Sequence, residues 1–289
     1  MLNKELNPKI ILSLTIDVIF KIYFGSPKNL PELKKFLKAH LNLSDEELST
    51  IQVLNPIILG DKIDAKSFTV DLLLKLKSGD IIHIEMQMSS HESVKERFQL
   101  YNARKAGEQI KSGEDYSKVR RTISLIVANF NVFPDSKKSH EKILMRRENG
   151  EIFTDAQELN IIDLTKVETD EETSREKYLW SKLFKAKTRE ELEMIASESE
   201  EWSAAANKVL ILSADERARA YADSHEYSEY SRGLREHGIR KEAIKQGIKQ
   251  GIDIGKVEIA KNLLAMGIAI EDISKATGLS ASELRGLDK

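Results

Sequence analysis

The residues best suited to chemistry lie on two strand-like segments that are joined by a short turn. Asp71 lies in SFTVDLLLKLK, and Glu85 and Gln87 lie in IIHIEMQM, with the residues SGD between the segments. Side chains alternate between the two faces of a strand, so Glu85 and Gln87 share a polar face. A three-residue turn would pair Lys77 with Ile81. Asp71 would then lie opposite Gln87, with Glu85 as its diagonal neighbour about 7–8 Å away at Cα.

Two carboxylates this close repel each other, so they need a raised pKa, a cation between them or exposure to water. Oxygen ligands of this kind suit Mg²⁺ or Mn²⁺. Such an ion polarises a phosphoryl oxygen and lowers the pKa of a bound water, and phosphodiester hydrolysis is the reaction that most needs both effects. The simpler interpretation of the spacing alone is a solvated outer hairpin face, since many exposed hairpins carry Asp and Glu.

Three further sets of polar residues could support this chemistry. Asp17 and Lys21 are four residues apart in a helical pattern, where they form either an ordinary ion pair or an acidic group beside the metal with a phosphate contact. Arg97 and Tyr101 have the same spacing, and they lie either on an exposed helical face or against a DNA backbone. His83 shares the polar face of Glu85 and is either a proton carrier or a surface residue.

The segments that must position these residues alternate between helical and strand-like patterns. Residues 8–40 are predicted to be helical around a break at Gly25–Pro27, and 51–88 are predicted to form strands. Residues 92–111 are again helical. TISLIVANF is a continuous apolar run, as expected for a strand buried on both faces, and KILMRRE and LNIIDLT resemble further strands. From about Glu171 to Ser231 the chain is helical and charged.

The overall composition is that of a soluble globular protein. The 289 residues are 40% hydrophobic and 32% charged, with a formal net charge of −2 and no cysteine. The lack of cysteine excludes disulfides and thiolate sites and fits a reducing compartment. We expect a cytoplasmic protein without a signal peptide or membrane span. A DNA-binding surface would have to be a local basic patch.

The last fifty residues or so differ from the rest. Gly247, Gly251 and Gly255 recur every four residues beside a parallel row of isoleucines. The segment is either a weakly helical linker or a close helix–helix contact, which could form between chains. Residues 232–261 carry an excess of four positive charges, enough for modest phosphate attraction. Two short helices joined at Gly278 would resemble a helix-turn-helix, but few side chains there can read bases, so a packing or oligomerisation module is favoured.

An ordered set of motifs resembles the recombination-promoting nuclease/putative transposase family of the PD-(D/E)XK nuclease superfamily. The resemblance covers roughly residues 10–165, and the glycine-periodic tail is also typical of the family. The pattern D-x₁₃-E-x-Q follows a helix carrying D-x-x-F-K-x-x-F-G and precedes R-x-x-x-Y. The matching residues are Asp17, Phe20, Lys21, Phe24, Gly25, Asp71, Ile84–Gln87, Arg97, Tyr101, Gly113–Tyr116 and Phe130–Phe133.

The resemblance implies an α/β fold with a restriction-endonuclease-like core, that is, a mixed sheet flanked by helices, and a helical C-terminal extension. The nuclease core would span 1–170, a helical extension packed on it 171–236, and a glycine-periodic helix with a helix-turn-helix-like tail 237–289. Val70 replaces the proline of the superfamily name, and Gln87 occupies the position of the usual lysine.

The resemblance implies the roles of Asp71, Glu85 and Gln87, and the spacing of the other polar residues adds the rest. Mg²⁺, replaceable by Mn²⁺, would be held by Asp71 and Glu85 with Asp17 as an additional acidic group. Gln87 and Lys21 would complete the catalytic set, and Lys75, Arg97 and Tyr101 would contact nucleic acid. The expected function is a metal-dependent endonuclease that cuts DNA with low sequence specificity, in recombination or mobile-element biology. The alternative is a catalytically weak nuclease fold that acts as a DNA-binding or assembly module, with homo-oligomers formed through the C-terminal helices.

Overall fold

The computed structural model describes residues 1–55, 72–90 and 92–287, without the side chains of 225–240. Two compact units can be separated, Met1–His225 and Glu226–Lys289. Val70 and Asp71, and with them one of the two expected metal ligands, lie outside the described residues. Among the described residues, none of the helices is both long and apolar enough to span a membrane.

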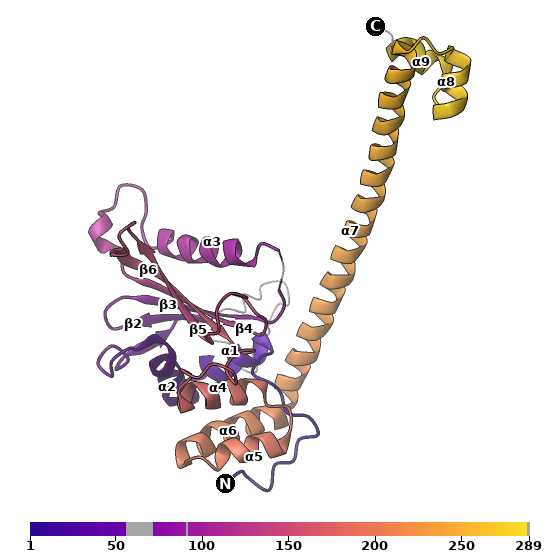
Figure 1. The fold of residues 1–289 in the computed structure, drawn as a ribbon. Helices are drawn as coiled ribbons and strands as arrows, with labels where there is room; N and C mark the ends of the chain where they lie inside the picture. Colours follow the sequence, from indigo (N-terminus) through magenta and orange to yellow (C-terminus); the bar gives the residue numbers. More distant parts are fainter. Residues whose placement is uncertain (56–71, 91, 288–289) are drawn as a thin grey trace. The chain divides into compact units, whose positions relative to one another are not determined.

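The first unit is built on a mixed sheet, as predicted. Within the described chain the strand order is β1-β2-β3-β4-β6-β5, with β3, β4 and β6 parallel and the other pairs antiparallel (Figure 1). Every residue of the central strand β4 is buried, because both faces of the sheet are covered. The strands are β1 (Ile51–Val53), β2 (Leu72–Leu76), β3 (Ile81–Gln87), β4 (Thr122–Ala128), β5 (His140–Arg146) and β6 (Ile152–Asp163).

Helices cover the two faces unequally. Of the described α-helices, α3 (Val94–Gly107) is the one on the first face, where Val94 and Phe98 pack against Ile126 and Ile161. The opposite face carries the larger core and a group of helices (Figure 1). These are α1 (Asp17–Gly25), α2 (Leu30–Leu41), α4 (Arg175–Lys185), α5 (Arg189–Ala196), α6 (Glu200–Ala214) and the beginning of α7 (Glu216–Ala265), with the short 3₁₀ helices η1 (Pro27–Asn29) and, away from this face, η2 (Tyr116–Lys118).

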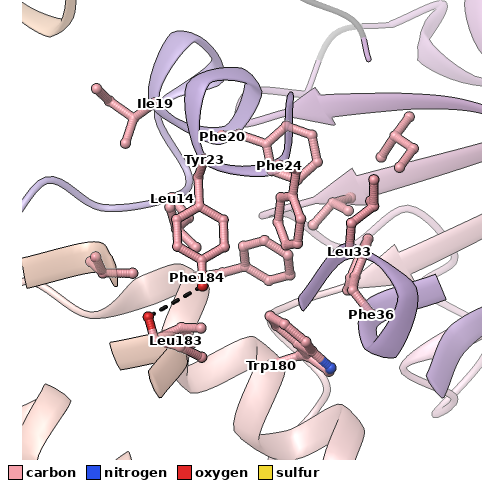
Figure 2. Packing of buried hydrophobic residues seen from close by; sticks show 14 of the residues in the cluster. Leu14, Ile19, Phe20, Tyr23, Phe24, Leu33, Phe36, Trp180, Leu183 and Phe184 are labelled. Carbon is pink, nitrogen blue, oxygen red and sulfur yellow. Dashed lines mark hydrogen bonds between the residues drawn. The ribbon is translucent and has the colours of Figure 1, made fainter. Parts of the chain in front are cut away.

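An aromatic cluster joins the first helices to those that follow the sheet. Phe24 of α1 lies 5.2 Å from Phe36 of α2 and 5.8 Å from Trp180 of α4, measured between ring centroids. Phe184 lies 5.2 Å from Phe36 (Figure 2). Tyr23 adds a hydrogen bond from its hydroxyl to the carbonyl of Ala205 in α6 (3.2 Å). The helices α4–α6 therefore belong to the same hydrophobic core as α1 and α2.

The register of the β2–β3 hairpin differs from the predicted one. Lys75, not Lys77, pairs with Ile81. The Gly79 amide donates to the Leu76 carbonyl (3.0 Å), and Gly79 has a φ of +93°, so the three-residue loop is 77–79 rather than 78–80. A glycine in the left-handed region is what this loop type requires as its last residue. The shift changes the pairing by two positions and therefore leaves every side chain on its predicted face.

A polar chain fixes the edge strand β5 to the larger helical layer. The Lys177 ammonium donates to His140 Nδ1 (3.2 Å), and His140 Nε2 donates to Asn160 Oδ1 (3.1 Å). Asn160 then donates to Glu158 (2.8 Å), which also accepts from Lys142 (2.9 Å). Burial, and then the charge of Lys177, lowers the pKa of His140 to about 4. His140 is therefore neutral and donates from Nε2 at neutral pH.

In the second unit, α8 (Ile270–Thr277) and α9 (Ala281–Leu287) are joined at Gly278, which has a φ of +74°. They pack on the end of α7 around Ala260, Ile273 and Leu284. Upstream, the glycine-periodic segment lies within α7. The segment is therefore helical, as both the linker and the helix–helix interpretations allow.

We predict that Phe184→Ala destabilises the protein by about 3–5 kcal/mol, because it leaves a cavity in the aromatic cluster. Phe153→Ala serves as the matched control, since Phe153 is 68% exposed. Chemical denaturation followed by tryptophan fluorescence would measure both. Equal effects of the two substitutions would show that the cluster does not hold the fold together.

We also predict that stability falls as the pH drops from about 6.5 to about 4. The folded pKa of His140 is below its unfolded value, so over this window the unfolded chain binds a proton that the native protein does not. The charged and titratable groups facing His140 are Lys177, Glu141, Glu158 and His40, whose own pKa is lowered by burial to about 3. His140→Gln should make the dependence of the unfolding free energy on pH shallower by at most about 1.4 kcal/mol per pH unit. An unchanged slope would contradict the neutral assignment.

Candidate functional site

The site is built on the central strand β3, and its polar face is buried. His83, Glu85 and Gln87 are 1%, 4% and 7% exposed. They lie on the face covered by α3, while Ile82, Ile84 and Met86 enter the larger core on the other face. The interpretation of this strand as a solvated outer face is wrong, because β3 lies between β2 and β4 and has helices on both sides. His83 is likewise not a surface residue.

Glu85 is held by an arginine from α3. Arg97 Nη2 donates to Glu85 Oε1 over 2.9 Å, from a side chain that is 37% exposed to one that is 5% exposed. The guanidinium also lies over the ring of Tyr101, 5.1 Å from its centroid. Phe98, the neighbour of Arg97, is fully buried, and this fixes the rotation of α3 over the sheet. Arg97 and Tyr101 therefore contact each other on one face of α3, and Arg97 also contacts the candidate metal ligand.

Gln87 ends the same strand and forms hydrogen bonds with the neighbouring loops. Its side-chain Nε2 donates to the backbone carbonyl of Ser89 (2.8 Å). Its backbone carbonyl accepts from the backbone amide of Asn129 (3.1 Å). In the parallel register, Gln87 lies beside Ala128, and Ala128 beside Asp163. The amide therefore shapes the loop that leaves β3, at the carboxyl ends of the parallel strands.

The other expected site residues lie on different elements. Asp17 is the first residue of α1 and is partly exposed, whereas Lys21 is only 4% exposed in the same helix. The hydrophobic side chains of α1 enter the core on the face of the sheet opposite α3. Lys75 is exposed on β2 and pairs with Ile81, so it lies at the turn end of the hairpin. Glu85 is four residues further along β3, which separates it from Lys75 by roughly 13 Å along the strand.

The described part of the donor set suits a divalent cation. Glu85 presents anionic oxygens inside the protein, where a carboxylate is costly unless cations neutralise it. Hard oxygen ligands of this type are those that Mg²⁺ takes. Among the residues that the structure describes there is no group of three or more acidic or histidine side chains arranged around a metal. The fit therefore rests on Glu85 and on the chemistry of Asp71.

One feature of the site escaped prediction from sequence. The pairing of Arg97 with Glu85 joins residues twelve positions apart on a strand and a helix. The spacing of Arg97 and Tyr101 indicated a common helical face, but not which surface that face would meet. Only the packing of Val94 and Phe98 on the sheet determines it.

Two family profiles match the chain. Residues 14–233 match the PD-(D/E)XK nuclease family transposases, and residues 255–289 match the C-terminal helix-turn-helix domain of the Rpn/YhgA-like nuclease family. The second match coincides with the end of α7, α8 and α9, and it confirms the helix-turn-helix-like tail. Such a domain suggests DNA binding. No curated protein and no solved structure matches the chain significantly.

Proposed function

We propose that this chain, which belongs to the PD-(D/E)XK nuclease family transposases, is a metal-dependent endonuclease that hydrolyses DNA phosphodiester bonds with low sequence specificity. The observation that supports this most directly is the buried Glu85, held by Arg97 at the centre of the sheet. A role in recombination or in mobile-element biology is part of the proposal. So is a cytoplasmic location, which fits a chain without cysteine.

Asp71 and Glu85 are proposed to hold Mg²⁺ or Mn²⁺, with Asp17 as an additional acidic group. The bound ion would polarise the phosphate and lower the pKa of a water molecule. The chain's own contribution is to keep Glu85 in place, through the ladder of β3 on both sides and the Arg97 contact above it. Gln87 orients the loop beside the site and offers an amide for hydrogen bonding.

Nucleic acid is proposed to approach from the side of α3, where Arg97 and Tyr101 are partly exposed. Lys75 would contact the backbone further away, and Lys21 would act from within α1. The helix-turn-helix tail would add a second DNA contact, which depends on salt because α7 carries the excess of basic residues. The alternative function is a catalytically weak nuclease fold that acts as a DNA-binding or assembly module. Gln87 is neutral where the superfamily usually has a lysine, so another group would have to supply the positive charge at the site.

We predict that the protein nicks or linearises plasmid DNA with Mg²⁺ or Mn²⁺ but not with Ca²⁺ or EDTA. Asp71→Ala and Glu85→Ala should each lower the rate by at least about 10²–10³, since each removes an oriented charge at the reacting phosphate. Glu148→Ala, at an exposed turn position, is the matched control.

Wild-type rates in the Asp71→Ala protein would refute the metal site. A wild-type protein that binds DNA but cuts none under any of these metals would support the assembly module instead.

We further propose that the chain forms a homo-oligomer through α7, with two copies packing as an antiparallel pair. Ile244, Ile248 and Ile252 are 53–60% exposed, and a Cβ atom added at Gly247, Gly251 or Gly255 would meet nothing within 4 Å. We call these six residues the isoleucine–glycine face. Each glycine weakens an isolated helix by about 1 kcal/mol relative to alanine, so a bare backbone here needs a compensating contact.

The sequence of this face is complementary to itself when one copy is reversed. An antiparallel register that places Ile248 opposite Gly251 also places Ile244 opposite Gly255, and Gly247 opposite Ile252. Each isoleucine then meets a position without a side chain, as two closely packed helices require. The same register brings Lys241 opposite Glu258, so the flanking charges attract each other.

We predict that Gly247→Ala with Gly251→Ala stabilises the helix of the monomer by about 2 kcal/mol in total, yet weakens association by filling the spaces that the isoleucines need. Circular dichroism would measure the first effect and sedimentation equilibrium the second. Gln246→Ala, on the other side of the helix, is the control and should leave association unchanged.

Opposite signs for helix stability and association are the distinctive result. A wild-type chain that stays monomeric, or a doubly substituted chain that associates as tightly as wild type, would contradict the proposal.

A further inference from the structure

We infer that Arg97 is the positioning residue of this site and supplies positive charge beside Glu85, a charge that Gln87 cannot supply. The inference rests on the proposed nuclease function and deepens it. Hydrolysis of a phosphodiester builds negative charge on the phosphate oxygens, so a cation or a set of fixed donors must face them. Gln87 carries no charge, and its amide already donates to the carbonyl of Ser89.

Arg97 contacts the candidate metal ligand Glu85 directly. Its Nη2 atom lies 2.9 Å from Glu85 Oε1. Lys75 lies at the turn end of the hairpin, and Lys21 is only 4% exposed, in a helix whose apolar side packs on the opposite face of the sheet. A phosphate arriving above Glu85 from the side of α3 would therefore meet the guanidinium.

The exposure of Arg97 suits this role. The carboxylate end of the pair is buried, whereas the arginine side chain is 37% exposed. The guanidinium thus extends from the buried Glu85 to the surface, where a DNA backbone can reach it. An arginine can serve both partners because its planar group carries five N–H donors in a fixed geometry.

The surroundings hold the guanidinium in one orientation. The ring of Tyr101 lies 5.1 Å below its central carbon, and Phe98 anchors the same helical turn in the core. The plane is therefore fixed between the edge of a carboxylate and the face of a ring. A lysine would keep the charge but would lose the planar stacking and the second donor direction.

A positioning role predicts a different pattern from a purely structural one. Arg97 repels a divalent cation while it orients the ligand oxygen, so its loss should not abolish metal binding. We expect Arg97→Gln to bind Mn²⁺ within about threefold of wild type, as measured by calorimetry, while cleavage falls by about 10²–10³. Arg97→Lys should have an intermediate rate. Added guanidinium ion should restore part of the activity of Arg97→Ala.

The matched control is Arg104→Gln, on the same helix. Arg104 pairs with Glu108 over 2.9 Å at an exposed position, so its loss should change neither metal binding nor cleavage. All variants would be compared in the full-length chain, with thermal unfolding as a check on folding. If Arg97→Gln fails to fold, the role of Arg97 is tested by the cleavage rate of Arg97→Lys and by the guanidinium rescue of Arg97→Ala.

The outcomes separate the two proposals. Cleavage by Arg97→Gln within threefold of wild type, while Glu85→Ala is inactive, would overturn the role of Arg97 and leave the nuclease function intact. Loss of Mn²⁺ binding together with cleavage would also overturn it, because Arg97 would then only maintain the shape of the site. A wild-type protein that cuts no DNA would overturn both.

Discussion

The ion pair between Glu85 and Arg97 joins the candidate site to the packing of the fold. A carboxylate that is almost fully buried in a sheet is stable only with a cation or good donors beside it. Arg97 meets this need from α3, and α3 can present it only because Val94 and Phe98 pack on β4 and β6. A rotation of α3 over the sheet would therefore break this ion pair.

The opposite face of the sheet carries the larger hydrophobic core, which offsets the cost of burying a carboxylate. There the rings of α1 and α2 pack against Trp180 and Phe184 of α4, and the helices that follow the sheet share one core with those that precede it. A polar chain through His140 and Asn160 also fixes the edge strand to this layer. The site is thus placed on a rigid platform, which suits a reaction that depends on preorganised charge.

The second unit has a much smaller core and, for its length, more exposed apolar side chains. Its small core around Ala260, Ile273 and Leu284 fits a helix-turn-helix, while the isoleucine–glycine face of α7 exposes apolar side chains next to bare backbone. A single helix gains nothing from that pattern. The proposed pairing of two copies would cover that face, whereas the first unit buries its apolar side chains in its own core.

The sequence by itself determined most of the strand and helix segments of the first unit and the face on which Glu85 and Gln87 lie, because periodicity is a local property. The mixed sheet was expected from the family resemblance, and the residues of the tail alone favoured a packing module over a helix-turn-helix. The predicted register of the hairpin was wrong by two positions. The true register depends on the backbone conformation of Gly79, whose positive φ closes the loop at residues 77–79. Only the tertiary structure decided that the polar face of β3 is buried and that Arg97 covers it. Alternation along a strand says which residues share a face, but not which helix, if any, will pack there.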